Sequence, residues 1–283
     1  MTIDADMIGM SAHGAEAKDL LPRLEKMSGA GFKAVEIPSN FCIEAPGFSP
    51  TFKRELKEAL EPFSTVTVHG MTTHIDAHEQ PPQPLDAQRL KVYFDLMDFA
   101  HDVGARIATF HPLMPHKYDI MLTHRFDDEA TVDQHVEAGR ILLPHGRDRR
   151  LTIGFEAFDT RIADRIDDEG WGSLFDIGHA SQTGVRSPYA DLTEQAHDMI
   201  RQRLDRIVQF HVHGVAMFDG SLCAHQPLDA DNLLDYGRIV GLLNQRRFQG
   251  PLIFEIVRKG DRLLPFEEAV EACVAAKQRL AAA

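Results

Sequence analysis

The sequence predicts a single (β/α)8 barrel, in which eight parallel strands alternate with helices around one closed sheet. Short apolar, β-branched runs alternate with amphipathic segments, which is typical of parallel strands joined by right-handed crossover helices. Eight such strands occur, and 283 residues shared among them give about 35 residues for each strand–helix unit. No linker-like or low-complexity stretch interrupts the pattern, so we expect one domain over residues 1–283.

The predicted strands are short runs that are rich in Val, Ile, Phe and other apolar side chains. In chain order they are MIGM (7–10), KAVEIP (33–38), TVTVH (65–69), RIATFH (106–111), LTIGFE (151–156), SLFDIGH (173–179), RIVQFHVH (206–213) and PLIFEIV (251–257). A doubly wound open sheet is the alternative arrangement of the same units. No GxGxxG or GxxxxGK[ST] motif follows the first strand, which disfavours the common nucleotide-binding versions of that sheet.

The predicted helices share apolar residues that recur at spacings of three and four. They cover 17–31, 51–62, 87–105, 128–144, 190–204, 231–245 and 266–280. A further helix has little room between Glu156 and Asp176, so we expect it to be short or irregular.

Composition narrows the classes of function. The net charge of −13 gives no attraction to phosphate backbones, so a nucleic-acid partner is disfavoured. No apolar run is long enough for a membrane span, and the acidic start MTIDADMIGMSAHG does not resemble an export signal. Cys42, Cys223 and Cys273 are too few and too scattered for a disulfide framework. We therefore expect a cytoplasmic protein.

Polar side chains gather at the carboxyl ends of the predicted strands, which form the catalytic face of such a barrel. Strand alternation places Gln209, His211 and His213 on one face of their strand, and it points Glu156 and Glu255 inward. Eleven of the fifteen histidines lie at strand ends or in the following loops. The polar residues at the strand ends are Glu36, His69, His111, Glu156, Asp176 with His179, His211 with His213, and Glu255.

A single histidine at a strand end is more often a hydrogen-bonded structural residue than a metal ligand. The carboxylates favour the metal, because a buried, unpaired Asp or Glu costs several kcal/mol and the chain offers few inward Arg or Lys residues. Carboxylates and imidazoles without paired cysteines suit Zn²⁺ or Mn²⁺. The sequence therefore predicts a site for one divalent cation.

Four short motifs, in order and at barrel spacing, resemble those of the xylose isomerase-like TIM barrels: GFEAFD, FDIGHA, FHVHG and IFEIV. The resemblance covers essentially the whole chain. Its sugar epimerases imply that Glu156, Asp176, His211 and Glu255 bind one divalent metal, and that His179 contacts substrate. We assign further substrate contacts to His69, His111 and Glu36.

The trinuclear zinc phosphodiesterases of the same superfamily provide a second resemblance. It rests on His69, on His111 in FHPLMPH, and on Cys223-Ala224-His225, where Cys223 stands at the position of an aspartate. The resemblance implies a possible second metal, a zinc, held among His69, His111, His179, Cys223 and His225. A mononuclear site with additional histidines and a site with two metals both stay open.

Where the epimerases carry a substrate-binding arginine, six residues after the strand-seven histidine, this chain has Met217. A different polar pocket could come from the long loops 70–85 and 112–129. Their candidates are His74, His78, His116, Tyr118, His124 and Arg125. The early loop PSNFCIEAPGFSP has no Lys or Arg, which argues against a DNA-repair role.

The preferred hypothesis is an isomerase or epimerase of a sugar or polyol that removes a proton next to a carbonyl. Glu156 and Glu255 would serve as base and acid, and the metal would stabilise the enediolate. The alternative is a metal-dependent phosphodiesterase, and a non-catalytic metal-binding barrel is the third hypothesis. The expected partner is a small sugar-like substrate, and a homo-oligomer stays open.

Overall fold

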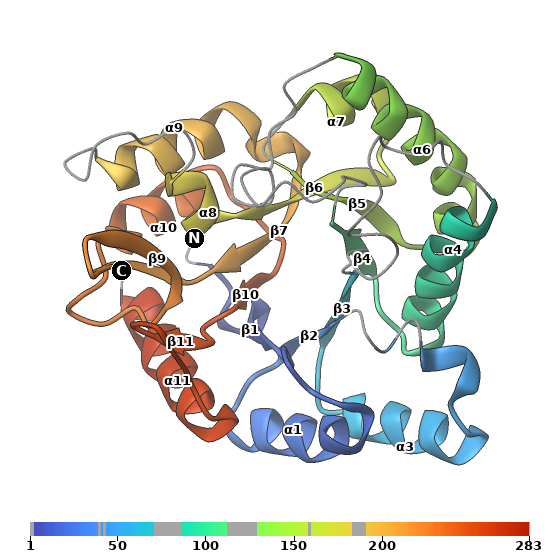
Figure 1. Ribbon diagram of the computed structural model, residues 1–283, viewed down its shortest axis with the longest axis horizontal. Coiled ribbons are helices and arrows are strands. Elements are labelled where there is room, and N and C mark those ends of the chain that lie inside the picture. Colours follow the sequence, from blue (N-terminus) through green and yellow to red (C-terminus); the bar gives the residue numbers. More distant parts are fainter. Residues whose placement is uncertain are drawn as a thin grey trace.

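Eight parallel strands form a closed barrel at the centre of the computed structural model, and helices surround it (Figure 1). The structure describes residues 3–38, 41, 44–70, 87–111, 129–157, 160–182 and 191–282. The strands follow one another in chain order, and the last closes the ring against the first, which confirms the predicted fold class. They are β1 (Ile8–Ser11), β2 (Ala34–Pro38), β3 (Thr65–Gly70), β4 (Ile107–Phe110), β5 (Thr152–Glu156), β6 (Trp171–Asp176), β7 (Ile207–Val212) and β10 (Leu252–Phe254).

The sixth strand differs most from its predicted range of 173–179. β6 ends at Asp176, and a short helix, α8 (Ile177–Gln182), begins immediately after it. The Asp176 carboxylate accepts a hydrogen bond from the backbone N–H of His179 at 2.7 Å. This is the bond by which an aspartate caps a helix start. Asp176 therefore ends the strand and starts the helix that carries His179.

The outer layer follows the predicted helical segments. Asp191 and Asp235 begin two of these helices by accepting from backbone N–H groups three residues ahead, which explains why the helices start there. The helix after β5 has only seven residues, as its short interval predicted. The helices are α1 (Ala17–Gly29), α3 (Pro50–Leu60), α4 (Ala87–Asp102), α6 (Glu129–Asp148), α7 (Thr160–Ile166), α9 (Leu192–Arg203), α10 (Tyr236–Gln245) and α11 (Phe266–Ala282).

Alternation along β7 divides the protein interior into two parts. Phe210 and Val212 are fully buried in the apolar layer between the barrel and its helices. Gln209 and His211 are also fully buried, and their polar groups contact others inside the barrel. The barrel interior is therefore polar toward its carboxyl end, while the apolar core lies outside the sheet.

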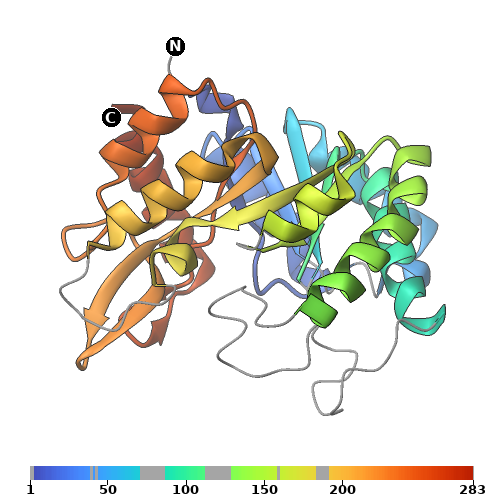
Figure 2. The same cartoon turned by 90° about the horizontal axis from the view of Figure 1, so that it is seen from above.

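Two antiparallel hairpins follow barrel strands at the same end of the barrel. The larger consists of β8 (Gly214–Phe218) and β9 (Ser221–Gln226), and Figure 2 shows it extending away from the barrel. The smaller consists of β11 (Arg258–Lys259) and β12 (Arg262–Leu263). The sequence analysis treated both segments as loops, which was wrong. The overlooked signal was Asp219-Gly220, whose positive φ angles of 46° and 76° suit a tight hairpin turn.

Among the described residues, no helix combines the length and the apolar character that a membrane crossing requires.

The pairing of β5 with β6 predicts one sharp effect on stability. Gly154 faces Gly172 across these strands, and a methyl group at Gly154 would overlap the carbonyl of Gly172. We expect Gly154→Ala to lower the free energy of unfolding by about 2–3 kcal/mol or more, measured by urea denaturation. The control is Gly241→Ala, at an exposed position of α10, where the added methyl group would have no neighbouring atom within 4 Å. It should be neutral or stabilise by up to about 1 kcal/mol, and equal losses in both variants would contradict the packing argument.

Candidate metal and acid–base site

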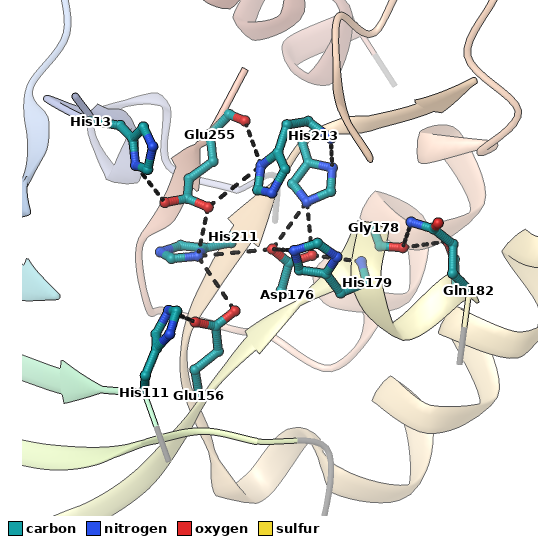
Figure 3. A network of polar contacts seen from close by, with 12 residues as sticks. His13, His111, Glu156, Asp176, Gly178, His179, Gln182, His211, His213 and Glu255 are labelled. Carbon is teal, nitrogen blue, oxygen red and sulfur yellow. Dashed lines mark hydrogen bonds and ion pairs between the residues drawn. The ribbon is translucent and has the colours of Figure 1, made fainter. Parts of the chain in front are cut away.

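Carboxylates and imidazoles from different strands meet at the carboxyl end of the barrel (Figure 3). Glu156 ends β5, Asp176 ends β6, His211 lies near the end of β7, and Glu255 directly follows β10. All four residues are buried, with at most 8% of each exposed. The sequence analysis assigned these four residues to one metal site, and the structure brings them together.

The Nδ1 atom of His211 lies at the centre of this group. It is 3.3 Å from Glu255 Oε2, 3.9 Å from Asp176 Oδ2 and 4.0 Å from Glu156 Oε1. Nδ1 is buried and forms no hydrogen bond. A buried ring nitrogen that faces three carboxylates without bonding to them is an unsatisfied polar group, and such groups call for a further partner.

Three of the four residues, Glu156, Asp176 and His211, have ligand atoms whose spacing fits one divalent cation. Donor atoms about 2.0–2.3 Å from a common ion lie about 3–4.5 Å from one another. Ligand atoms of Glu156, Asp176 and His211 all lie within 4.8 Å of one another, and Glu255 is closer still to His211. The set of one imidazole and three carboxylates contains no thiolate, which suits Zn²⁺ or Mn²⁺.

Glu36 lies behind His211, on the side away from the three carboxylates. Its Oε2 is 2.9 Å from His211 Nε2 and also accepts a hydrogen bond from Gln209 Nε2. Because a carboxylate oxygen accepts, Nε2 of His211 carries the proton and Nδ1 is left to bind a metal. Glu36 is fully buried. Its position favours orienting His211 over the substrate contact that the sequence analysis assigned to it.

The second carboxylate oxygen of Glu156, Oε2, contacts two histidines. Oε2 is 3.2 Å from His69 Nε2 and 3.0 Å from His111 Nε2, and His69 Nδ1 is 3.0 Å from the Thr109 hydroxyl. His69, His111 and Glu156 thus form a second group that could hold a metal. Glu156 belongs both to this group and to the central group with Asp176 and His211.

A third group, formed by His179, His213 and His225, lies beside Asp176. His213 Nε2 is 3.0 Å from both oxygens of Asp176, and His213 Nδ1 accepts from the backbone N–H of His225 at 2.9 Å. His213 therefore orients Asp176 much as Glu36 orients His211. Within the part of the chain that the structure describes, Cys223 belongs to none of these groups, so its binding of metal stays a prediction.

Burial and neighbouring charges shift the pKa values of three residues in the site. Burial alone would lower the pKa of His211, but the carboxylates of Glu255 and Glu36 raise it well above its usual range. Burial would likewise raise the pKa of Glu255, and the charge of His211 instead holds it well below the usual range. Burial and the neighbouring imidazoles of His213 and His179 lower the pKa of His225 to about 3. In the metal-free protein, a proton on His211 therefore stands where a cation would bind.

Met217, which stands where the epimerases carry an arginine, is on β8 and is 41% exposed. The pocket candidates of the long loops lie outside the described residues: His74, His78, His116, Tyr118, His124 and Arg125. The analysis assigned no role to Gln209 or His213, although strand alternation had already placed both on the inward face of β7.

Comparison with known proteins agrees with the barrel fold. The family model described as xylose isomerase-like TIM barrel matches residues 24–276. A search of curated proteins finds no match. A D-psicose 3-epimerase with D-tagatose from Clostridium cellulolyticum H10 superposes with a TM-score of 0.70 at 15% identity, covering 99% of this chain and 98% of that one.

Two other solved structures superpose over nearly their whole length. The IolI protein with a bound zinc atom has a TM-score of 0.70 at 14% identity and covers 100% of this chain and 98% of its own. A xylose isomerase-like TIM barrel protein from Mycobacterium smegmatis, in complex with magnesium, has a TM-score of 0.65 at 16% identity and coverages of 95% and 90%. At such identities the likeness shows a shared fold.

The contact between Glu36 and His211 predicts an effect on metal affinity. Glu36→Gln removes the carboxylate that holds His211 Nε2, so the ring loses its fixed tautomer and orientation. We expect the dissociation constant for Zn²⁺ to rise about 10- to 100-fold, measured by competition with a chelating dye. The control is Glu58→Gln, which changes an exposed carboxylate on α3, outside the site. Unchanged affinity in Glu36→Gln would show that Glu36 does not orient the ligand.

Proposed function

Because the chain belongs to the xylose isomerase-like TIM barrel family, we propose that it is a divalent-metal-dependent isomerase or epimerase of a sugar or polyol. The observation that carries the proposal is the single imidazole nitrogen of His211, which faces three buried carboxylates. Glu156, Asp176, His211 and Glu255 would hold the cation. When bound, such a cation polarises a carbonyl group and stabilises the enediolate that forms on proton removal.

The two glutamates would transfer protons on opposite faces of a bound substrate. Figure 3 shows Glu255 and Glu156 reaching His211 from opposite sides. Epimerisation requires a proton to leave from one face of a carbon and to return on the other face, and two carboxylates arranged in this way can do both. The charge of His211 holds the pKa of Glu255 low in the metal-free site, so this carboxylate is ionised, and its position beside His211 Nδ1 is what supports a role in proton transfer.

The remaining polar side chains at the carboxyl end of the barrel would bind the sugar. His179 is partly exposed and lies three residues after Asp176, in the first turn of α8. Its ring therefore lies beside the proposed cation. His111 is partly exposed as well, with 15% of its side chain open to solvent, whereas the His69 side chain is only 5% exposed. His179 and His111 are therefore the better candidates for substrate contacts, and His69 is better placed to support Glu156.

A metal-dependent phosphodiesterase is the second candidate. The observation in its favour is that two further groups, His69–His111–Glu156 and His179–His213–His225, flank the central one. If both held zinc, a row of metals could activate a hydroxide for attack on phosphorus. The number of metals bound by the protein therefore distinguishes the two functions.

The proton-transfer role predicts the behaviour of Glu255→Gln. The amide still offers an oxygen ligand but cannot carry a proton, so the variant should keep its fold and most of its metal. We expect deuterium incorporation next to the carbonyl of D-tagatose, D-fructose or D-allulose in heavy water to fall about 10²- to 10⁴-fold, measured by NMR. Glu58→Gln is again the control. Undiminished exchange in Glu255→Gln would remove Glu255 from the reaction.

Metal loading provides the second test, and its pH dependence follows from the raised pKa of His211. Below that pKa the ring is protonated, and it must lose its proton to bind a metal, so apparent affinity should rise with pH by up to about tenfold per unit. Calorimetry of the metal-free protein with Zn²⁺ or Mn²⁺, in buffers of different ionisation enthalpy, should find one equivalent bound and about one proton released.

The same titration decides between the candidates. Two to three zinc equivalents, together with hydrolysis of bis(p-nitrophenyl) phosphate, would favour the phosphodiesterase. Binding of no divalent metal would overturn both.

A further inference from the structure

His225 has an unusual backbone conformation. In the β8–β9 hairpin, Gly214 pairs with Gln226 and Ala216 pairs with Cys223. Two residues of β9, Ala224 and His225, therefore face the single residue Val215 of β8. This is a β-bulge, and its second residue, His225, has a φ of 59°. The left-handed region is uncommon for residues other than glycine. Bulges with such strain are often found where a side chain has been redirected for function.

Three hydrogen bonds hold His225 in this position. Its backbone N–H donates to His213 Nδ1 at 2.9 Å, and its carbonyl accepts from Val257 N–H at 3.1 Å. Its ring Nδ1 is 3.1 Å from the backbone carbonyl of Glu255. A carbonyl only accepts, so Nδ1 carries the proton. In the neutral ring, Nε2 is therefore a lone-pair acceptor.

The ring is placed at the edge of the acid–base site. Its centroid is 4.2 Å from that of His213 and 4.9 Å from that of His179, and its Nδ1 is 3.7 Å from Glu255 Oε2. About 24% of its side chain is exposed, whereas His213 is fully buried. The ring can therefore reach a molecule bound beside Glu255.

We propose that His225 is a specificity-determining residue whose Nε2 accepts a hydrogen bond from a substrate hydroxyl group. The inference rests on the proposed isomerase or epimerase function and names its substrate class as neutral, polyhydroxylated sugars. An acceptor lone pair attracts a hydroxyl and repels the oxygens of a phosphate or a carboxylate, which need donors such as Arg or Lys. This chain has Met217 in place of the arginine of the epimerases, and the acceptor of His225 comes from a different position, on the returning strand of the hairpin.

The test compares two substitutions that differ in reach. In His225→Asn the amide nitrogen takes the place of Nδ1 and can still donate to the Glu255 carbonyl, but no atom reaches the position of Nε2. Asn also tolerates a positive φ, so the hairpin should fold. In His225→Gln the longer side chain can bring an amide oxygen to the position of Nε2. Ser221→Ala, at the exposed start of the same strand, is the control.

Each metal-loaded protein would be assayed with D-tagatose and with D-tagatose 6-phosphate. We expect His225→Asn to raise KM for D-tagatose about 3- to 10-fold, the value of one neutral hydrogen bond, with a smaller change in kcat. The preference for D-tagatose over its phosphate should fall by the same factor. His225→Gln should recover part of the loss, and bound metal should stay the same in every variant.

Two results would overturn the inference while leaving the proposed function intact. One is an unchanged KM and an unchanged preference in His225→Asn. The other is the loss of about one metal equivalent in that variant, which would make His225 a metal ligand. If the unmodified protein transforms no ketohexose and instead hydrolyses bis(p-nitrophenyl) phosphate, the proposed function itself fails, and the assignment of His225 fails with it.

Discussion

The constraint on which the site depends is negative charge buried inside the barrel. Glu36, Glu156, Asp176 and Glu255 all lie within a few ångströms of His211 or its immediate neighbours. For Glu36, Asp176 and Glu255, every ion-pair partner among the described residues is a histidine. Neutral imidazoles do not balance four carboxylates, so the metal-free protein must take up protons or leave charge unbalanced. A divalent cation would offset two of these four charges.

The surrounding residues convert that charge into fixed geometry. Glu36 and Gln209 hold His211, His213 holds Asp176, and Thr109 with His69 supports Glu156. Each of these three inner groups thus has a partner that determines which of its atoms points to the centre. Such support makes a site selective, because a ligand that can turn accepts many ions and positions none of them well.

Much of this arrangement could be read from the sequence, because a barrel strand has a strict period of two. Short apolar, β-branched runs identified the eight strands, and the period of two correctly placed Glu156, His211 and Glu255 on the inward face. The role of Glu36 could not be read, because its contact with His211 joins residues 175 positions apart and depends on how the ring closes. The larger hairpin was missed because its strands are partly exposed and lack a clear apolar alternation, and the smaller because its strands have only two residues each.

The larger hairpin also bears on how this protein can diverge. Strands β8 and β9 form backbone ladders only with each other, so the register of the barrel does not depend on them. Residues can be exchanged or inserted near Asp219-Gly220 while the strands that carry the carboxylates stay in place. The scaffold thus separates inherited chemistry from adaptable recognition. A lineage can acquire a new preference through a few changes in an appendage that lies outside the strand pairing of the barrel.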